Sequence, residues 1–236
     1  MVKTIKFEQA RDVGFPVTAA KIYDAQCVDE IIFLDIMAST QGRQSLIETI
    51  DKVTKECFMP FTAGGGIRNL SDIRILLKAG ADKVVINTAA VLNPRLISRA
   101  AKQFGSANIV VSIDYKEKSS GKKVFTHGGR NESRWQAIDW AREAERLGAG
   151  EVFLNSIDRD GTMEGYDIEA IKGVSDLLKI PVIACGGAGK LKDFADAFKE
   201  SHVSAVAAGS IFHFTDQSPI KARAYLKESK INVRIA

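Results

Sequence analysis

The sequence has few cysteines and few histidines, and this scarcity excludes several kinds of chemistry. Its three cysteines, Cys27, Cys57 and Cys185, are an odd number without metal-ligand spacing, which indicates reduced thiols in a reducing compartment. No set of histidine, cysteine and carboxylate residues has the spacing of a metal site. No serine or cysteine lies in a nucleophile motif. We therefore expect no metal, no cofactor and no covalent catalysis.

Long hydrophobic runs and an excess of one charge are also missing. No apolar run approaches the ~20 residues of a membrane span, and no secretory signal opens the chain. The 33 Lys and Arg residues against 29 Asp and Glu residues leave a net charge of +4, and the basic residues are spread along the helical segments. A concentrated basic footprint for nucleic acid is therefore not expected. The prediction is a cytoplasmic protein that binds neither nucleic acid nor a membrane.

What the sequence does contain is a repeat of itself at an offset of 121 residues, the distance from Pro60 to Pro181. Residues 60–66 align with 181–187, and the same shift places Glu30 on Glu151. Each copy runs from strand to helix to a glycine-ended strand, and then through a helix to a strand with small residues at its end. A period of this length describes half of a (β/α)8 barrel.

Apolar segments of strand length alternate with amphipathic segments of helix length. The expected strands are 31–36, 60–63, 83–87, 109–114, 151–156, 181–184 and 204–207, and the expected helices are 16–26, 44–56, 70–79, 93–104, 134–147, 167–178, 190–200 and 217–229. This alternation predicts an α/β fold, a (β/α)8 TIM barrel, with a parallel sheet inside a ring of helices. We expect one domain over 1–236, with half repeats near 1–108 and 109–236. The irregular stretch 115–133 is expected to form a hairpin lid over the active face.

The expected elements include eight helices but only seven strands. The repeat places the missing strand before residue 1, because 109–114 opens the second half. Residues 3–7 are then the tail of the first βα loop, and either a misassigned start or a trimmed variant would explain the loss. Seven strands patterned for eight should leave a gap between 31–36 and 204–207. Apolar residues should be exposed on both edges, with a tendency to self-associate.

Two glycine turns occupy equivalent places in the two halves. Residues 64–66 and 186–189 follow strands and precede helices, where backbone N–H groups can bind an anion, although glycine also serves plain turns. Small residues end the following strand in each half, and this recurrence favours two phosphate sites for a substrate with a phosphate at each end. To substrate and phosphate binding we assign Lys3, Asp35, Gly65, Gly66, Asn87, Thr88, Gly186, Gly187, Gly209 and Ser210.

Three carboxylates follow predicted strands, at the end where a barrel assembles its catalytic groups. They are Asp35, Asp114 and Asp160. A single aspartate there can simply cap the next helix, but three at one mouth favour general acid and base chemistry. We assign Asp160 as the general acid and Asp114 as a supporting base or orienting group.

Other polar residues near the mouth have structural interpretations. Asp158 is expected to hold its loop together with Arg159. His127, in the expected lid, and His213, between two phenylalanines, are expected in solvent or in packing.

Charged residues also mark the opposite end of the predicted barrel. Glu30, Lys83 and Glu151 lie at or just before the starts of their strands. They could form ordinary surface ion pairs of little energetic value. Alternatively, three charges of mixed sign facing the axis could form a ring around the central pore.

Several segments resemble the cyclase subunit of imidazole glycerol phosphate synthase. They are 33–36, 64–67, 86–90, 156–162, 186–189 and 232–234, and the resemblance covers essentially the whole chain. It implies a (β/α)8 barrel that converts a bis-phosphate ribulosyl aminoimidazole carboxamide nucleotide into imidazole glycerol phosphate and aminoimidazole carboxamide ribotide. The ammonia for this reaction comes from a glutaminase partner in a heterodimer.

The resemblance also implies roles for single residues. Asp160 and Asp114 match family aspartates at the active site, and Glu30, Lys83 and Glu151 match three of four residues of the family's ammonia gate. The other principal catalytic aspartate and the gate arginine lie on the family's first strand, so the resemblance implies badly reduced activity for the chain as given.

Two other functions remain open. Segments 2–7, 56–60, 155–156 and 184–187 resemble cyclase-like subunits that conduct ammonia in surface-sugar amidation. A sugar-phosphate isomerase on the same scaffold is the third alternative. It would turn over without any ammonia source.

Overall fold

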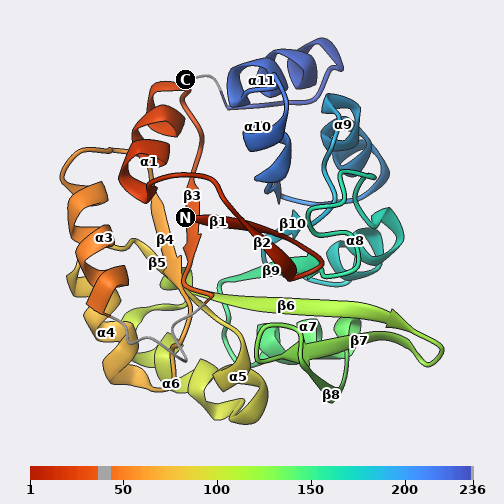
Figure 1. Cartoon of the computed structure of the whole chain (residues 1–236). Coiled ribbons are helices and arrows are strands. Elements are labelled where there is room, and N and C mark those ends of the chain that lie inside the picture. Colours follow the sequence, from red (N-terminus) through yellow and green to blue (C-terminus); the bar gives the residue numbers. More distant parts are fainter. Residues whose placement is uncertain (37–43, 235–236) are drawn as a thin grey trace.

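The computed structural model describes residues 1–36 and 44–234, and its centre is a curved parallel sheet (Figure 1). Its seven parallel strands are β3 (Ile31–Leu34), β4 (Phe61–Gly64), β5 (Lys83–Ile86), β6 (Ile109–Lys118), β9 (Glu151–Ser156), β10 (Val182–Cys185) and β11 (Ala205–Val206). They are hydrogen-bonded in the order β11-β10-β9-β6-β5-β4-β3. All seven expected strands are present, and the parallel sheet of a (β/α)8 barrel is confirmed.

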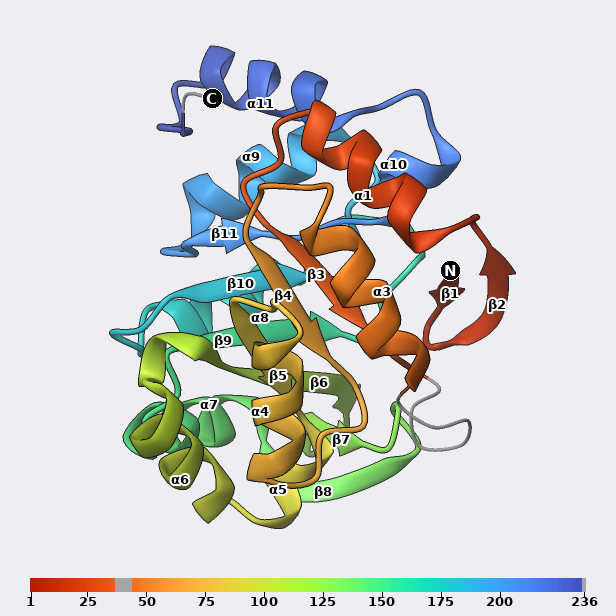
Figure 2. The same ribbon diagram turned by 90° about the vertical axis from the view of Figure 1, so that its left-hand side faces the viewer.

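Helices surround this sheet on its outer face (Figures 1 and 2). They are α1 (Pro16–Ala25), α3 (Gln44–Thr54), α4 (Leu70–Lys78), α5 (Thr88–Leu92), α6 (Arg95–Phe104), α7 (Ala137–Arg146), α8 (Ile168–Ser175), α9 (Leu191–Glu200), α10 (Ser210–Phe214) and α11 (Pro219–Glu228), with a 3-10 turn at Ser106–Asn108. The eight expected helices are found with shifted ends. The short helices α5 and α10 were not expected, and they follow the small residues at equivalent places of the two halves.

Side chains alternate between two apolar layers along the strands. Val84 and Val111 belong to the large core between the sheet and the helices. Val85, Val110 and Phe153, together with Ile183, form a separate cluster on the opposite face of the sheet. Because successive residues of a strand point to opposite faces, this second cluster fills the inside of the curve. Both faces of the sheet are therefore buried, as expected for parallel strands.

Two hairpins extend the barrel. Strands β1 (Val2–Ile5) and β2 (Glu8–Asp12) pair antiparallel in a sheet of their own. The segment expected as a loop tail is therefore a hairpin, although it lies outside the barrel sheet. Strand β6 continues past the barrel and pairs with β7 (Gly121–Thr126), which pairs with β8 (Asn131–Gln136). The expected hairpin in 115–133 is present, and its action as a lid remains a prediction.

The sheet is open at one seam, where the expected gap is found. Strands β3 and β11 are the two ends of the hydrogen-bonded order. On the β3 side Leu34 is 37% exposed and Ile36 is 57% exposed. On the β11 side Ala205 and Val206 are half-buried, so the expected exposure on both edges is wrong for this edge.

A few side-chain contacts in the outer layer cross this seam. The hydroxyl of Tyr23, in α1, lies 3.1 Å from Nε2 of His213, in α10, and its ring packs edge-on against Phe212. Arg223, in α11, donates a hydrogen bond to the Cys27 carbonyl oxygen in the loop before β3. Helix contacts thus bridge a position at which the strands do not pair, and they help to explain why the β11 edge is partly covered.

Candidate functional site

Asp114 lies on β6, between two strands that each contribute an asparagine. Asn87, which follows β5, places its Nδ2 atom 2.6 Å from Oδ2 of Asp114. Asn155, on β9, also hydrogen-bonds the carboxyl group, and Ser112 donates to Oδ1 over 3.1 Å. Ser112 and Asp114 share a face because they are two residues apart on one strand. The carboxyl group is therefore held by three polar side chains.

Burial determines the protonation of Asp114, whose residue surface is only 9% exposed. Removal from water is the largest effect and raises the pKa of this carboxyl group, as does the charge of Asp160. The hydrogen bonds from Ser112, Asn87 and Asn155 act in the opposite direction, and the net pKa is about 7. A carboxyl group with a pKa near neutrality can both take up and release a proton at physiological pH.

The two asparagines leave acceptors unused inside the site. Among the described residues, neither Oδ1 of Asn87 nor Oδ1 of Asn155 has a hydrogen-bond partner, and both atoms are buried. A buried acceptor without a donor costs about 1–3 kcal/mol, so such groups point to a ligand or solvent that supplies one. Asn155 and Ser112 were missed as site residues in the sequence. The only signal for Ser112 is its position two residues before Asp114. The only signal for Asn155 is its position directly across from Asp114 on the neighbouring strand.

Asp160 follows β9 and is 7% exposed. Its Oδ2 atom accepts a hydrogen bond of 3.0 Å from Oγ1 of Thr4. Burial raises the pKa of Asp160, and the charge of Lys3 and the bond from Thr4 oppose this effect. The structure thus brings the two assigned acids, Asp114 and Asp160, into electrostatic contact at one mouth of the barrel.

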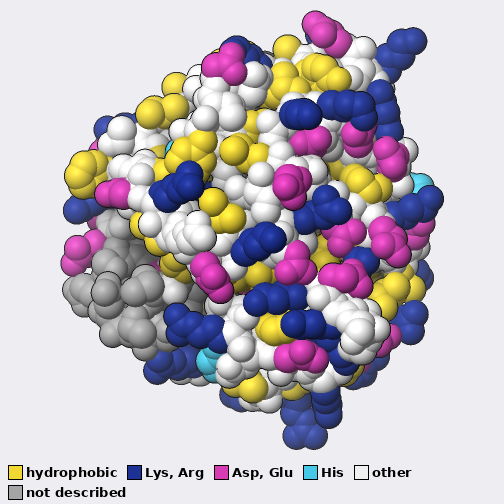
Figure 3. Space-filling view, turned by 45° about the vertical axis from the view of Figure 1, so that its right-hand side comes forward, with side chains coloured by type: hydrophobic (Ala, Val, Ile, Leu, Met, Phe, Trp, Pro, Cys, Tyr) yellow, Lys and Arg dark blue, Asp and Glu magenta, His cyan; other side chains and the backbone are white. Residues whose placement is uncertain are grey.

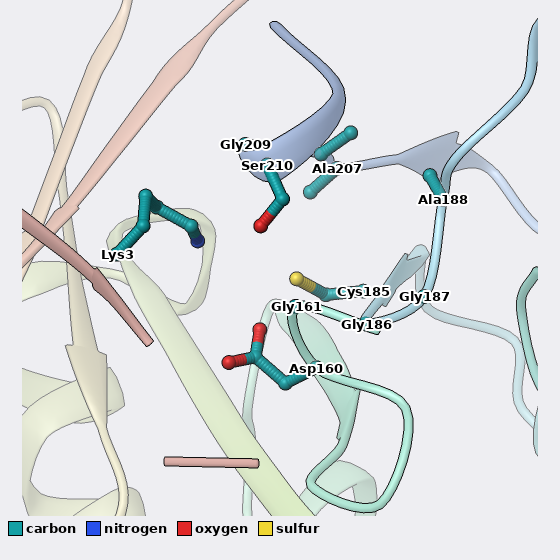
Figure 4. A pocket seen from close by; sticks show the side chains of 11 residues that line it. Lys3, Asp160, Gly161, Cys185, Gly186, Gly187, Ala188, Ala207, Gly209 and Ser210 are labelled. Atoms are coloured by element: carbon teal, nitrogen blue, oxygen red, sulfur yellow. The ribbon is translucent and has the colours of Figure 1, made fainter. Parts of the chain in front are cut away.

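The second glycine turn and Lys3 form a small cavity beside Asp160 (Figure 4). Its volume is about 20 Å³, and its lining residues include Gly186, Gly187, Gly209 and Ser210. A Cβ atom on Gly209 would lie 2.8 Å from Nζ of Lys3, so the ammonium group lies directly over this backbone. The five residues assigned to this phosphate site are therefore together.

Cys185 also lines this cavity, and Figure 4 shows its sulfur directed toward Asp160 and Lys3. Burial raises the pKa of the thiol to about 12, and the charge of Asp160 adds to this effect. The group is therefore a neutral thiol at physiological pH. The three described cysteines are free, as expected of reduced thiols; Cys57 is buried and Cys27 is exposed.

The first glycine turn lies beside the end of β3. Gly65 has φ +101°, and a Cβ atom there would overlap the carbonyl oxygen of Asp35. Gly66 also has a positive φ, of 61°. The Thr88 hydroxyl accepts a hydrogen bond of 2.9 Å from the backbone N–H of His127. Since the amide of Asn87 donates to Asp114, the polar side chains of this half connect to the acid and to the β7–β8 hairpin.

The charged residues at the opposite end of the barrel meet one another. Nζ of Lys83 lies 2.9 Å from Oε2 of Glu30 and 2.7 Å from Oε1 of Glu151. The hydroxyl of Thr62 donates to Glu30. Oε2 of Glu151 is buried and has no partner among the residues that the structure describes. A lysine shared by two carboxylates agrees with a ring at the strand starts better than with separate surface pairs, while its role as a gate remains a prediction.

The other polar residues have the structural surroundings expected of them, with one correction. Oδ2 of Asp158 accepts a hydrogen bond of 2.7 Å from the backbone N–H of Glu117, whereas Arg159 donates to the Gly165 carbonyl oxygen. Both residues hold the loop, but the expectation that they do so as a pair is wrong, because each reaches a different backbone group. His127 is exposed, and His213 packs half-buried against Tyr23.

Two other kinds of feature are absent from the described part of the chain. No group of His, Cys, Asp and Glu among these residues could hold a metal ion. No helix within 1–36 and 44–234 is both long and apolar enough to cross a membrane. On the face in Figure 3, Lys and Arg side chains alternate with Asp and Glu.

Known proteins are similar in sequence to this chain over almost its whole length. A model of the family described as "Histidine biosynthesis protein" matches residues 1–218. The imidazole glycerol phosphate synthase subunit HisF of Geobacillus kaustophilus (strain HTA426) is 50% identical over 236 residues, with 99% of this chain and 94% of the relative covered. HisF of Geobacillus thermodenitrificans (strain NG80-2) is 48% identical over the same shares.

The chain belongs to the histidine biosynthesis protein family. The resemblance to the cyclase subunits that was drawn from short motifs is confirmed, because both relatives carry that subunit name and match almost the whole chain. Membership in this family also agrees with the barrel fold. The relatives are named as subunits, which implies that a protein of this kind works with a further chain.

Proposed function

We propose that the chain is the cyclase subunit of imidazole glycerol phosphate synthase, a lyase of histidine biosynthesis. It uses ammonia to convert the bis-phosphate ribulosyl aminoimidazole carboxamide nucleotide into imidazole glycerol phosphate and aminoimidazole carboxamide ribotide. The observation that carries this proposal is the pair of buried carboxyl groups, Asp114 and Asp160, beside a glycine cavity that holds the ammonium group of Lys3.

The two aspartates divide the proton transfers. Asp114, with a pKa of about 7, accepts a proton from the attacking nitrogen or from the ring that forms. Asp160 is assigned as the general acid, and burial supports this role because it raises the pKa of the group above its usual value, although Lys3 and Thr4 oppose the effect. The unpartnered amide oxygens of Asn87 and Asn155 are acceptors for N–H groups of the ammonia or of the substrate carboxamide.

Phosphate binding is assigned to the two glycine turns. The cavity with Lys3, Gly186 and Gly209 offers backbone N–H groups and one cation, which suits a phosphate dianion. The equivalent turn at Gly65 and Gly66 serves the other phosphate. Two anion sites on one face hold the substrate by both ends and place its centre over the acids.

A glutaminase subunit supplies the ammonia in a heterodimer that docks at the end of the barrel carrying Glu30, Lys83 and Glu151. These residues meet at the strand starts, opposite the acids, so that ammonia entering there passes along the barrel axis. Such a ring would also suit an ammonia-conducting subunit in sugar amidation. The names of the two relatives favour the histidine enzyme.

The test is co-purification with candidate glutaminases, followed by glutamine-dependent turnover of the nucleotide. Asp160→Asn is expected to lower kcat far more than it raises KM, because the acid acts in the transition state and not in binding. Asp139→Asn, an exposed change on α7, is the matched control and should leave both constants unchanged. Equal effects of Asp160→Asn on kcat and KM would contradict this division of roles.

A further inference from the structure

The N-terminal hairpin meets the loop after β9 at Asp160. Besides the 3.0 Å bond from the Thr4 hydroxyl to Oδ2 of Asp160, the backbone N–H of Lys6 donates to the Asp160 carbonyl oxygen over 2.8 Å. A Cβ atom on Gly161 would overlap the Thr4 carbonyl oxygen. Strand β1 is therefore packed directly against the turn that carries the acid, although the two lie 156 residues apart in the sequence.

We propose that Thr4 is a positioning residue, whose hydroxyl binds Oδ2 of Asp160 and so leaves Oδ1 as the oxygen that carries the transferable proton. The inference rests on the proposed function of Asp160 as an acid. A hydroxyl that donates to one carboxylate oxygen fixes the plane of the group and stabilises its charge. When the carboxyl group is protonated at Oδ1, Oδ2 remains an acceptor and the bond to Thr4 persists.

The groups around Asp160 show why such a residue matters. Burial favours the neutral acid, and Lys3 from β1 opposes it with a positive charge. Asp114 on β6 and the neutral thiol of Cys185 at the end of β10 lie within electrostatic reach, since the charge of Asp160 raises the pKa of both groups. Among the residues that the structure describes, Thr4 is the side chain that hydrogen-bonds one particular oxygen of this carboxyl group, whereas Lys3 acts through its charge.

The hairpin thereby couples two functions. Lys3 and Thr4 are neighbours in β1, and the first reaches the glycine cavity while the second reaches the acid. Docking of one strand sets both the cation of the phosphate site and the orientation of Asp160. An acid loosened by loss of the hydroxyl would retain its neighbours but sample more than one orientation.

The test is a carbon-13 NMR titration of the aspartate carboxyl groups, with the Asp160 signal assigned by its loss in Asp160→Asn. Thr4→Val has nearly the same shape as threonine but no hydroxyl, and it is expected to raise the pKa of Asp160 by about one pH unit. Thr4→Ser keeps the hydroxyl and should restore the titration. Thr18→Val, an exposed change on α1, is the matched control and should leave Asp160 unchanged.

The proposal would be overturned if the Asp160 signal titrated in folded Thr4→Val as in the wild type. It would also be overturned if Thr4→Ser shifted the pKa of Asp160 as far as Thr4→Val does. If Thr4→Val does not fold, Thr4→Ala provides the same comparison with Thr4→Ser. The proposed function fails separately: full turnover in Asp160→Asn would remove the catalytic role while the titration could still show that Thr4 controls the carboxyl group.

Discussion

Asn87 and Asp114 are joined by a hydrogen bond of 2.6 Å between Nδ2 and Oδ2, made between side chains from neighbouring strands of the barrel. The bond places a neutral donor on a carboxyl group that is otherwise removed from water. It stabilises the charged form but does not offset burial, since the pKa of Asp114 still lies near 7. The balance between these effects makes the protonation of this site measurable near neutral pH.

The first prediction concerns stability against pH. The pKa of Asp114 is raised from 3.8 to about 7 in the folded protein, so between these values the folded state binds more protons than the unfolded state. The contribution of Asp114 to the free energy of unfolding therefore falls as the pH rises from about 4 to 7. As the pH rises from 5 to 8, the free energy of unfolding of Asp114→Asn should increase relative to that of the wild type by about 1–4 kcal/mol, measured by urea denaturation. Parallel pH curves for the two proteins would refute the raised pKa.

The second prediction concerns the charged ring. Burial alone lowers the pKa of Lys83, but Glu151 and Glu30 outweigh it and raise the pKa above its usual value. Lys83→Met leaves two carboxylates facing each other and should lower the free energy of unfolding by about 1–4 kcal/mol. The stabilisation from a raised lysine pKa is complete below pH 10.5, the usual value, and is lost only above it. The loss of unfolding free energy in Lys83→Met should therefore be constant from pH 6 to 9. Lys102→Met, exposed on α6, should change little; an equal loss there would argue against the ring.

The third prediction separates binding from folding at the glycine cavity. Gly209→Ala places a methyl group 2.8 Å from the flexible end of Lys3, so the chain should fold normally but bind the nucleotide more weakly in calorimetry. Gly187 has φ +110° and faces the Gly165 backbone, so Gly187→Ala should destabilise the fold by about 1–3 kcal/mol. Gly173→Ala in α8, where an added Cβ atom would lie 3.9 Å from the side chain of Ile138, should be slightly stabilising. An unchanged affinity of Gly209→Ala for the nucleotide would show that Lys3 does not take part in binding it.

The fourth prediction concerns the open seam between β3 and β11. Unpaired strand edges promote association, and Leu34 and Ile36 are exposed on the β3 side. The chain should therefore self-associate in light scattering coupled to size exclusion, and Leu34→Lys should shift it toward the monomer. Leu92→Lys, which replaces an exposed leucine on α5, should not. A wild-type monomer with a sharp thermal transition would show that the helix contacts suffice to protect the seam.

Much of the fold could be predicted from the sequence because the half-barrel repeat constrains both halves at once. The glycine turns and the strands before them were found at their expected places. The residues that hold the acids were harder to find. Thr4 reaches Asp160 from the other end of the chain, and no local pattern encodes a contact of that range. Ser112 and Asn155 face the barrel interior among apolar neighbours, so their role depends on register between strands, which the sequence leaves open.

The most direct test of the account is turnover of the bis-phosphate nucleotide with an ammonium salt as nitrogen donor, which removes any need for the partner subunit. We predict slow formation of imidazole glycerol phosphate by the chain, and loss of this activity in both Asp114→Asn and Asp160→Asn, with Asp139→Asn active as the wild type. Absence of product from the wild-type chain, or equal rates in the two acid variants and the wild type, would contradict the assignment of these aspartates as the catalytic pair.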